Sequence, residues 1–292
     1  MQTTAKPRRS VLYMPGSNAR ALQKAADLPT DAVILDLEDA VAPGEKATAR
    51  NLVAEAVQSG RYGRREVAVR VNGLDTEWGL EDLAAAVACA PDAILIPKVE
   101  DAEQMRDIDR RIVDLGGSTE IALWAMMETP LGVLNAAEIA ASTARLRVMI
   151  LGTNDLVNEL QGSHTTDRQP VITALGLCLL AARAHGLAVV DGVYNAFRDD
   201  RGLRAACEQG KAMGMDGKTL IHPSQIAITN EIFAPDQSEL EEAKRYVAAF
   251  EEAEAAGQGV AVVDGKIVEN LHVENARRLL QMSDAIAALA AG

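Results

Sequence analysis

The sequence is poor in aromatic residues, cysteine and positive charge, and each shortage excludes a class of protein. Phe, Trp and Tyr make up 3% of the 292 residues and hydrophobic residues 48%, so a packed core has to be aliphatic. The balance of 29 basic against 42 acidic residues argues against nucleic acid as a partner, because phosphate contacts need an excess of Lys and Arg. Cys89, Cys178 and Cys207 lie far apart, which predicts neither a disulfide framework nor a zinc site.

Several common sequence signals are missing as well. The N-terminal MQTTAKPRRS lacks the apolar segment of a secretory signal, and no apolar run is long enough to span a bilayer. We therefore expect a soluble cytoplasmic protein with no membrane partner. The G-x-G-x-x-G, H-E-x-x-H and G-x-S-x-G motifs do not occur, so the signatures of dinucleotide-binding folds, zinc proteases and serine hydrolases are absent.

What the sequence does have is a repeat of short β-branched runs, each followed by turn residues and an Ala-rich helical stretch. Strands are predicted at residues 10–14, 32–38, 67–72, 93–98, 120–128, 147–152, 187–193 and 218–222, and helices over 19–27, 46–58, 101–115, 131–141, 170–184 and 203–213. Eight such units are typical of an α/β TIM (β/α)8 barrel. The doubly wound Rossmann fold is the rival, but its glycine motif is missing.

The last fifth of the chain is not needed to close a barrel. An acidic helix over 238–256 is followed by a turn at Asp264-Gly265 and a final helix. We therefore predict a catalytic barrel domain over residues 1–232 and a C-terminal helical extension over 233–292. The extension would cover the barrel mouth as a lid, pack on a neighbouring subunit, or do both.

Polar side chains end nearly every predicted strand, and the C-terminal ends of barrel strands are where TIM barrels place their active sites. They include Asp36, Arg70, Lys98, Glu128, Asp155, Asp191 and His222. Glu128 ends an otherwise apolar strand and Asp155 follows the next one. Two carboxylates without nearby His or Cys predict a hard ion such as Mg²⁺, with Mn²⁺ as an alternative. The competing interpretation is that Asp155 only caps a helix and Glu128 pairs with a lysine.

The segment VILDLEDAV places Asp36, Glu38 and Asp39 at the end of a strand that is otherwise built for burial. An unpaired buried carboxylate is costly, so these side chains need water or a cation. We interpret them as an outer set of acids that hold metal-bound waters or orient Arg70, which ends the next strand.

The loop MPGSNARALQKA offers free backbone N–H groups at a helix start, with Arg20 and Lys24 on one face of that helix. This pattern predicts a phosphate-binding loop. Arg8 and Arg9 are expected to add positive charge beside it. An ordinary capped surface helix is the alternative.

Taken together, these motifs resemble the family of the citrate lyase β subunit and malyl-CoA lyase, within the HpcH/HpaI aldolase superfamily. The segments that carry the resemblance are LYMPGSNARALQKA, ILDLEDAVAPGEKATAR, VRVNG, IPKV, METPLGVLNAAEIA, LGTNDL, HPSQI and VVDGKIVENLHVENARRLL, and they span the whole chain. DGVYNAF and DGKTLIHP are most similar to compact bacterial (S)-malyl-CoA enzymes, which include both lyases and a thioesterase.

The resemblance implies the same metal pair and phosphate-binding loop, and it adds roles that the residues alone do not give. Glu128 and Asp155 would bind the metal, and the acyl-CoA nucleotide would lie on the loop with Tyr13, Arg20 and Lys24. Catalysis would involve Arg70, Glu38, Asp39 and Asp264. Arg70 would hold the thioester oxygen or the oxo-acid end. Asp264 would serve as an acid/base delivered by an adjacent subunit of a homotrimer or homohexamer.

The implied activity is a carbon–carbon lyase that cleaves (S)-malyl-CoA to acetyl-CoA and glyoxylate through an enolate. A malyl-CoA thioesterase that releases malate and CoA would use the same residues. Two further alternatives are a CoA-independent class II 2-oxo-acid aldolase and a catalytically inactive assembly protein. The Arg20/Lys24 loop and Asp264 argue against the aldolase, and the complete set of site residues argues against an inactive protein.

Overall fold

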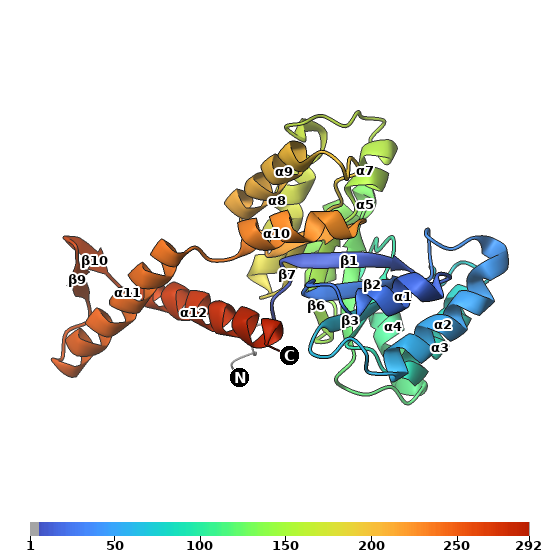
Figure 1. Cartoon of the computed structure of the whole chain (residues 1–292), viewed down its shortest axis with the longest axis horizontal. Coiled ribbons are helices and arrows are strands. Elements are labelled where there is room, and N and C mark those ends of the chain that lie inside the picture. Colours follow the sequence, from blue (N-terminus) through green and yellow to red (C-terminus); the bar gives the residue numbers. More distant parts are fainter. Residues whose placement is uncertain (1–5, 292) are drawn as a thin grey trace. The chain divides into compact units, whose positions relative to one another are not determined.

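The structure is a computed structural model and describes residues 6–291. Residues 8–233 form a closed barrel of eight parallel strands that follow one another in chain order (Figure 1). The strands are β1 (Ser10–Pro15), β2 (Ala32–Asp36), β3 (Glu66–Arg70), β4 (Ala93–Ile96), β5 (Ala122–Met127), β6 (Leu146–Leu151), β7 (Ala188–Asp191) and β8 (Gly217–Leu220). The predicted TIM-type barrel is confirmed, with all eight strands at the expected places.

Helices connect successive strands around the barrel. They are α1 (Ala19–Ala25), α2 (Lys46–Gln58), α3 (Gly79–Cys89), α4 (Ala102–Asp114), α5 (Pro130–Leu134), α6 (Ala136–Ala140), α7 (Thr153–Glu159), α8 (Gln169–Ala184), α9 (Asp200–Met213) and α10 (Ile226–Phe233), with 3₁₀ turns η1 (Pro43–Glu45) and η2 (Pro223–Gln225). The prediction of a single helix over 131–141 is wrong, because the helix is interrupted at Asn135. The backbone of Asn135 departs from helical geometry, and its side chain donates to the carbonyl of Glu100 at 2.8 Å.

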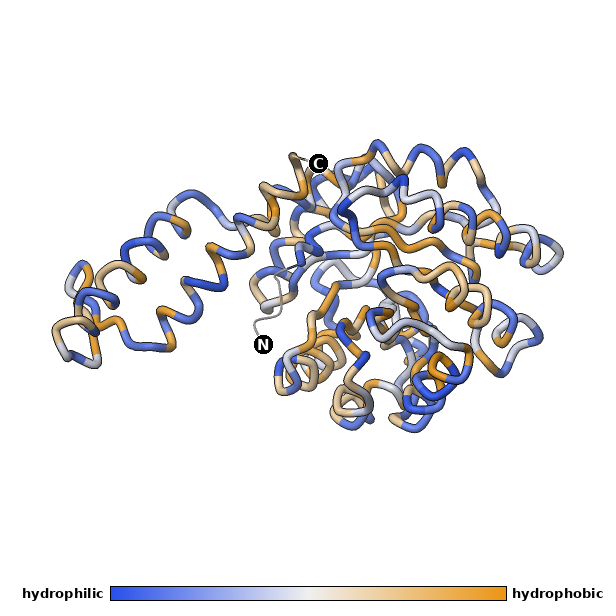
Figure 2. Tube along the Cα trace, turned by 90° about the horizontal axis from the view of Figure 1, so that it is seen from below, coloured by the Kyte–Doolittle hydropathy of each residue, from blue (hydrophilic) through white to orange (hydrophobic). Residues whose placement is uncertain are grey.

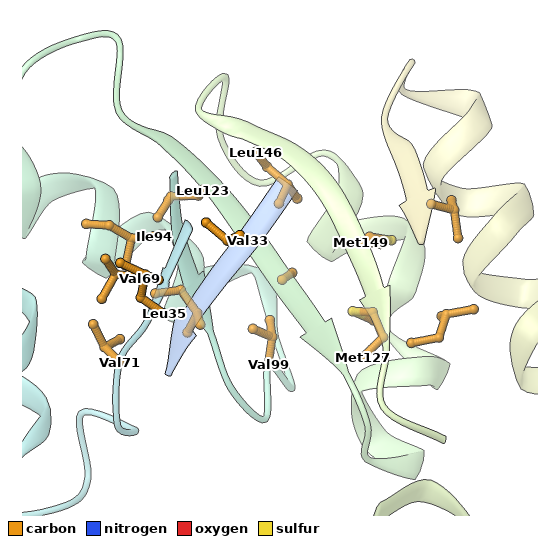
Figure 3. Packing of buried hydrophobic residues seen from close by; sticks show 14 of the residues in the cluster. Val33, Leu35, Val69, Val71, Ile94, Val99, Leu123, Met127, Leu146 and Met149 are labelled. Carbon is orange, nitrogen blue, oxygen red and sulfur yellow. The ribbon is translucent and has the colours of Figure 1, made fainter. Parts of the chain in front are cut away.

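Alternation of side chains along the strands divides the core into two layers. Ile34, Ala68 and Trp124 belong to the cluster inside the barrel, whereas Val33 and Leu35 belong to the cluster between strands and helices. Figure 3 shows the second layer, and Figure 2 shows hydrophobic segments along the barrel strands. Because side chains alternate with a period of two, Asp36 shares the inward direction of Ile34, and Arg70 shares that of Ala68. Both residues end their strands, so their side chains lie at the mouth of the barrel.

Residues 234–291 form most of a second compact unit. It contains α11 (Gln237–Ala255), β9 (Ala261–Val263), β10 (Lys266–Val268) and α12 (Asn270–Ala290), with α11 and α12 packed together. Asp264 and Gly265 form the turn of the β9–β10 hairpin, with φ angles of 50° and 76°. Asp-Gly is favoured in two-residue hairpin turns because both positions need positive φ.

No helix in the described part of the chain combines the length and the apolar character that crossing a bilayer would require.

Candidate active site

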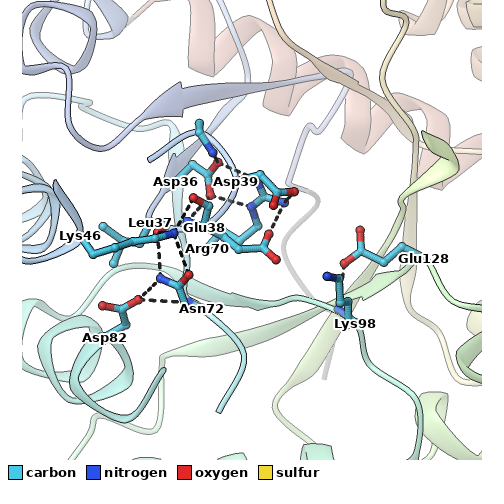
Figure 4. Close-up of polar contacts among 11 residues, drawn as sticks. Asp36, Leu37, Glu38, Asp39, Lys46, Arg70, Asn72, Asp82, Lys98 and Glu128 are labelled. Carbon is cyan, nitrogen blue, oxygen red and sulfur yellow. Dashed lines mark hydrogen bonds and ion pairs between the residues drawn. The ribbon is translucent and has the colours of Figure 1, made fainter. Parts of the chain in front are cut away.

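Arg70 stands at the centre of an acidic group at the barrel mouth. It ends β3 directly beside Asp36, the last residue of β2. Its Nε and Nη2 donate to the two carboxylate oxygens of Asp36 at 2.6 Å each (Figure 4). Its Nη1 lies 2.6 Å from Glu38 Oε2 and 3.6 Å from Asp39 Oδ2. A bidentate pair of this kind fixes the orientation of the guanidinium.

The electrostatics of this group differ from one side chain to the next. Burial opposes the charge of Arg70, but Asp36 outweighs it and raises the pKa of Arg70 well above its usual value. Burial raises the pKa of Glu38 to about 7, although Arg70 works in the opposite direction. Glu38 is therefore a carboxyl group that can exchange a proton near neutral pH.

A buried lysine supports the loop that carries Glu38. The Nζ atom of Lys46 donates to the carbonyls of Leu37 and Glu38 and to Asn72 Oδ1, each at 2.8 Å. Asn72 in turn donates to the carbonyl of Leu37 at 2.8 Å. The sequence analysis missed Lys46, because a lysine at the start of an amphipathic helix looks like a surface residue.

Glu128 and Asp155 form a second acidic group at the same mouth. Glu128 directly follows β5 and is 2% exposed, while Asp155 lies half-buried in the first turn of α7. Glu128 Oε1 accepts a hydrogen bond from the backbone N–H of Lys98 at 2.9 Å. Gly152 leaves room for the Glu128 side chain, because a Cβ at that position would come within 2.6 Å of Oε2.

The two acids face each other without a compensating side-chain cation. Burial, and then the neighbouring Asp155, raise the pKa of Glu128 to about 8. Within residues 6–291 neither carboxylate is in an ion pair with Lys, Arg or His, and the side chain of Asp155 does not cap α7. The structure therefore favours neither the lysine partner nor the helix-capping role considered as the alternative for this pair.

The donor set of this pair fits a magnesium ion. Carboxylate oxygens are the ligands that Mg²⁺ prefers, and the raised pKa of Glu128 reflects its burial beside a second acid, Asp155. Among the described residues, no third Asp, Glu, His or Cys joins the two. The other positions around an ion would fall to water and substrate oxygens, as is common for Mg²⁺ in proteins.

The predicted nucleotide loop follows β1 on the same side of the barrel. Asn18 caps α1 by accepting from the N–H of Ala21 at 3.0 Å, and Arg20 and Lys24 are exposed on this helix. Tyr13 lies on β1 instead, with its ring 5.0 Å from the Arg70 guanidinium. Tyr13 is thus positioned at the mouth, and its predicted contact with CoA stays a prediction, as do those of Arg20 and Lys24.

The expectation that Arg8 and Arg9 add charge beside this loop is wrong. Both residues precede β1, so the length of the strand separates them from the loop that follows it. Arg8 Nε donates to Glu66 at 2.6 Å, and Arg9 Nε donates to Asp31 at 2.8 Å. They neutralise acids at the opposite end of the barrel.

Asp264 lies in the hairpin turn of the C-terminal unit. Its Oδ2 accepts from Arg245 Nη1 at 2.6 Å, and both side chains are exposed. Its action on the mouth of another subunit, like the predicted lid and oligomer, stays a prediction.

A (β/α)8 barrel with two neighbouring carboxylates at its mouth, neither of them in an ion pair within the described residues, is typical of metal-dependent barrel enzymes. Residues 9–223 match the family model described as HpcH/HpaI aldolase/citrate lyase, and the chain belongs to this family. The predicted family is confirmed.

Relatives that match along nearly the whole chain carry two kinds of name. A protein of Cereibacter sphaeroides named (3S)-malyl-CoA thioesterase is 58% identical, with 100% of both chains covered. The protein of Escherichia coli K12 named citrate lyase subunit beta is 37% identical and covers 97% of this chain and 95% of its own. These names favour the thioesterase alternative over the carbon–carbon lyase that the sequence analysis preferred.

Solved structures of similar fold hold the predicted ligands. Protein CitE of Mycobacterium tuberculosis, in complex with magnesium, acetoacetate and coenzyme A, superposes with a TM-score of 0.76 at 29% identity, covering 97% of this chain and 100% of its own. A citrate lyase beta subunit from the same organism, with oxaloacetate and magnesium, gives a TM-score of 0.69 at 31% identity, covering 80% and 100%.

Proposed function

We propose that the protein is a Mg²⁺-dependent thioesterase that hydrolyses (3S)-malyl-CoA or a closely related 3-hydroxyacyl-CoA to the free acid and CoA. The observation that carries this proposal is the pairing of the buried Glu128 with the half-buried Asp155 at the barrel mouth. It is supported by 58% identity along the whole chain to a relative named for this activity.

Glu128 and Asp155 would hold the ion. When bound, Mg²⁺ would act as a Lewis acid and template for the oxygens of the acyl group. The backbone N–H of Lys98 and the space left by Gly152 keep the Glu128 carboxylate in position for this task.

Arg70 would stabilise the charge that develops on the thioester oxygen when water adds to the carbonyl carbon. Its guanidinium is already fixed by Asp36, so little reorganisation is needed during the reaction. The C–S bond then breaks, and the CoA thiolate leaves as the thiol with the proton that was taken from water. The acyl carbon keeps the oxygen of water as a carboxylate, and the second proton of water is released to solvent.

Glu38 is our candidate for the base that takes a proton from the attacking water. It lies 2.6 Å from Arg70, and burial raises its pKa to about 7, which suits proton transfer near neutral pH. Asp39, 3.6 Å from Arg70, adds negative charge at the edge of this group.

The test is to incubate the purified protein with (3S)-malyl-CoA and Mg²⁺ and to measure free thiol, malate and glyoxylate together. We expect equal amounts of thiol and malate, and no glyoxylate. Glyoxylate and acetyl-CoA without thiol would establish the lyase reaction instead, and no product of either kind would refute the proposal.

A further inference from the structure

Lys98 has a strained backbone at the mouth of the barrel, after strand β4. It has a φ of 47°, a left-handed value that is costly for a residue with a long side chain. This conformation directs its backbone N–H to Glu128 Oε1 at 2.9 Å. The main chain of Lys98 thus has a clear task, whereas its exposed side chain does not.

Several other cations near the strand ends already have protein partners. Arg70 forms ion pairs with Asp36 and Glu38. Lys46 donates to three oxygen atoms, and both Arg168 and Lys218 bind Asp191. In the part of the chain that the structure describes, no carboxylate forms an ion pair with the Lys98 ammonium.

The Lys98 ammonium lies within electrostatic reach of four acids, Glu38, Asp39, Glu128 and Asp155. Figure 4 shows Lys98 beside Glu128, with Arg70 and its acids in a separate group.

An anionic acyl group has few places to bind in a mouth with so many carboxylates. We propose that the Lys98 ammonium binds the free carboxylate of the acyl group, so that the site selects CoA esters of dicarboxylic acids. The proposal deepens the function proposed above and rests on it. A charged hydrogen bond to a substrate carboxylate is strong enough to decide between otherwise similar acyl chains.

The substitution Lys98→Asn tests this role without disturbing the main chain. Asn tolerates positive φ and keeps the N–H that binds Glu128. Lys98→Arg restores the charge, and Arg106→Asn is the matched control, because it removes one exposed cation from α4, the helix after the same strand.

Two acyl-CoAs that differ only in the carboxylate give the readout. In Lys98→Asn we expect KM for (3S)-malyl-CoA to rise about 10- to 100-fold, the loss typical of a charged hydrogen bond. The inhibition constant of 3-hydroxybutyryl-CoA should be unchanged, Lys98→Arg should recover most of the loss, and Arg106→Asn should resemble wild type. Mg²⁺ affinity, measured by calorimetry, should stay equal or increase.

Equal losses for both acyl-CoAs, an unchanged KM, or a fall in Mg²⁺ affinity in Lys98→Asn would overturn the inference. If wild type leaves malyl-CoA intact, the proposed function fails, and calorimetry with L-malate then decides about Lys98. Binding of malate to the Mg²⁺-loaded wild type that weakens in Lys98→Asn supports the inference; no binding, or equal binding, refutes it.

Discussion

Glu128 and Asp191 are both buried carboxylates at the ends of barrel strands, yet their surroundings are opposite. Asp191 ends β7 and is 0% exposed, and Arg168 Nη1 lies 2.7 Å from both of its oxygens. Lys218 Nζ donates to it at 2.8 Å. Glu128 follows β5, is 2% exposed, and receives one backbone hydrogen bond from Lys98.

This difference in partners reverses the effect of burial. Burial alone would raise the pKa of both acids, but Lys218 and Arg168 lower the pKa of Asp191. At Glu128 burial and the neighbouring Asp155 raise the pKa, and the backbone N–H of Lys98 lowers it by less. Protein cations therefore compensate the charge of Asp191 (the complete network), whereas we propose that a cation from solution compensates Glu128 (the incomplete site).

The largest expected effect is on activity at the incomplete site. Glu128→Gln or Asp155→Asn should lower thioester hydrolysis by at least about 1,000-fold, because Lewis-acid stabilisation is worth several kcal/mol. Circular dichroism should show an unchanged fold. Turnover close to wild type in either variant would contradict the assignment of Glu128 and Asp155 to a metal site.

A substitution in the complete network around Asp191 should lower the stability of the protein instead. Asp191→Asn leaves Lys218 and Arg168 without their carboxylate, and breaking a buried pair in this way costs about 3–5 kcal/mol. The free energy of unfolding, from urea denaturation of the metal-free protein, should fall by this amount. Glu128→Gln is the matched control and should be as stable as wild type or more stable. Equal destabilisation of the two variants would contradict our distinction.

A third carboxylate, Glu38, is intermediate between Asp191 and Glu128, because it is buried but has one cation, Arg70, beside it. The pH dependence of activity tests its role as a base. Burial raises its pKa to about 7 against the pull of Arg70. A base acts when deprotonated, so hydrolysis should be lost as pH falls through about 7 and should level off above it. Glu38→Gln should lower kcat about 100-fold and remove this limb of the profile. An unchanged limb in the variant would assign the base to another residue.

A smaller effect is expected from the space around Glu128. A Cβ at position 152 would crowd Glu128 Oε2, so Gly152→Ala should weaken Mg²⁺ binding about 10-fold, in the range seen when support of a metal ligand is lost. Gly176→Ala is the control, because nothing lies within 4 Å of a Cβ there. If calorimetric titration finds the same Mg²⁺ affinity in Gly152→Ala and wild type, Glu128 can move without weakening metal binding.

The smallest effect is expected outside both acidic groups, at Arg20 and Lys24. Both are exposed on α1, and exposed ion pairs with phosphate are screened by salt. Replacing either with Ala should raise KM for the acyl-CoA about two- to fivefold without changing kcat, and less so at high salt. A change in kcat alone would place these residues outside the nucleotide site.

Sequence reasoning predicted correctly those features for which burial produces a recognisable hydrophobic pattern. The β-branched runs located all eight strands, and an apolar strand that ends in Glu128 predicted an acid at the mouth. It failed where the role of a charged residue depends on the residue that it contacts. The sequence alone does not distinguish the buried Lys46 from a surface lysine. Sequence reasoning also placed Arg8 beside the loop after β1, although Arg8 lies at the other end of that strand.

Other features depended on contacts that are distant in sequence. Lys98 was recognised as one of several polar strand-end residues, but its positive φ and its hydrogen bond to Glu128 follow from the packing of β4 beside β5. The break at Asn135 likewise depends on the carbonyl of Glu100, 35 residues earlier.

The central claim is that the acids at positions 128 and 155 together bind a divalent cation. Calorimetric titration of Mg²⁺ into the metal-free protein, alongside Glu128→Gln and Asp191→Asn under conditions where both are folded, measures this directly. We predict one site per chain in wild type and Asp191→Asn, and no binding in Glu128→Gln. Equal Mg²⁺ binding by wild type and Glu128→Gln would contradict the account.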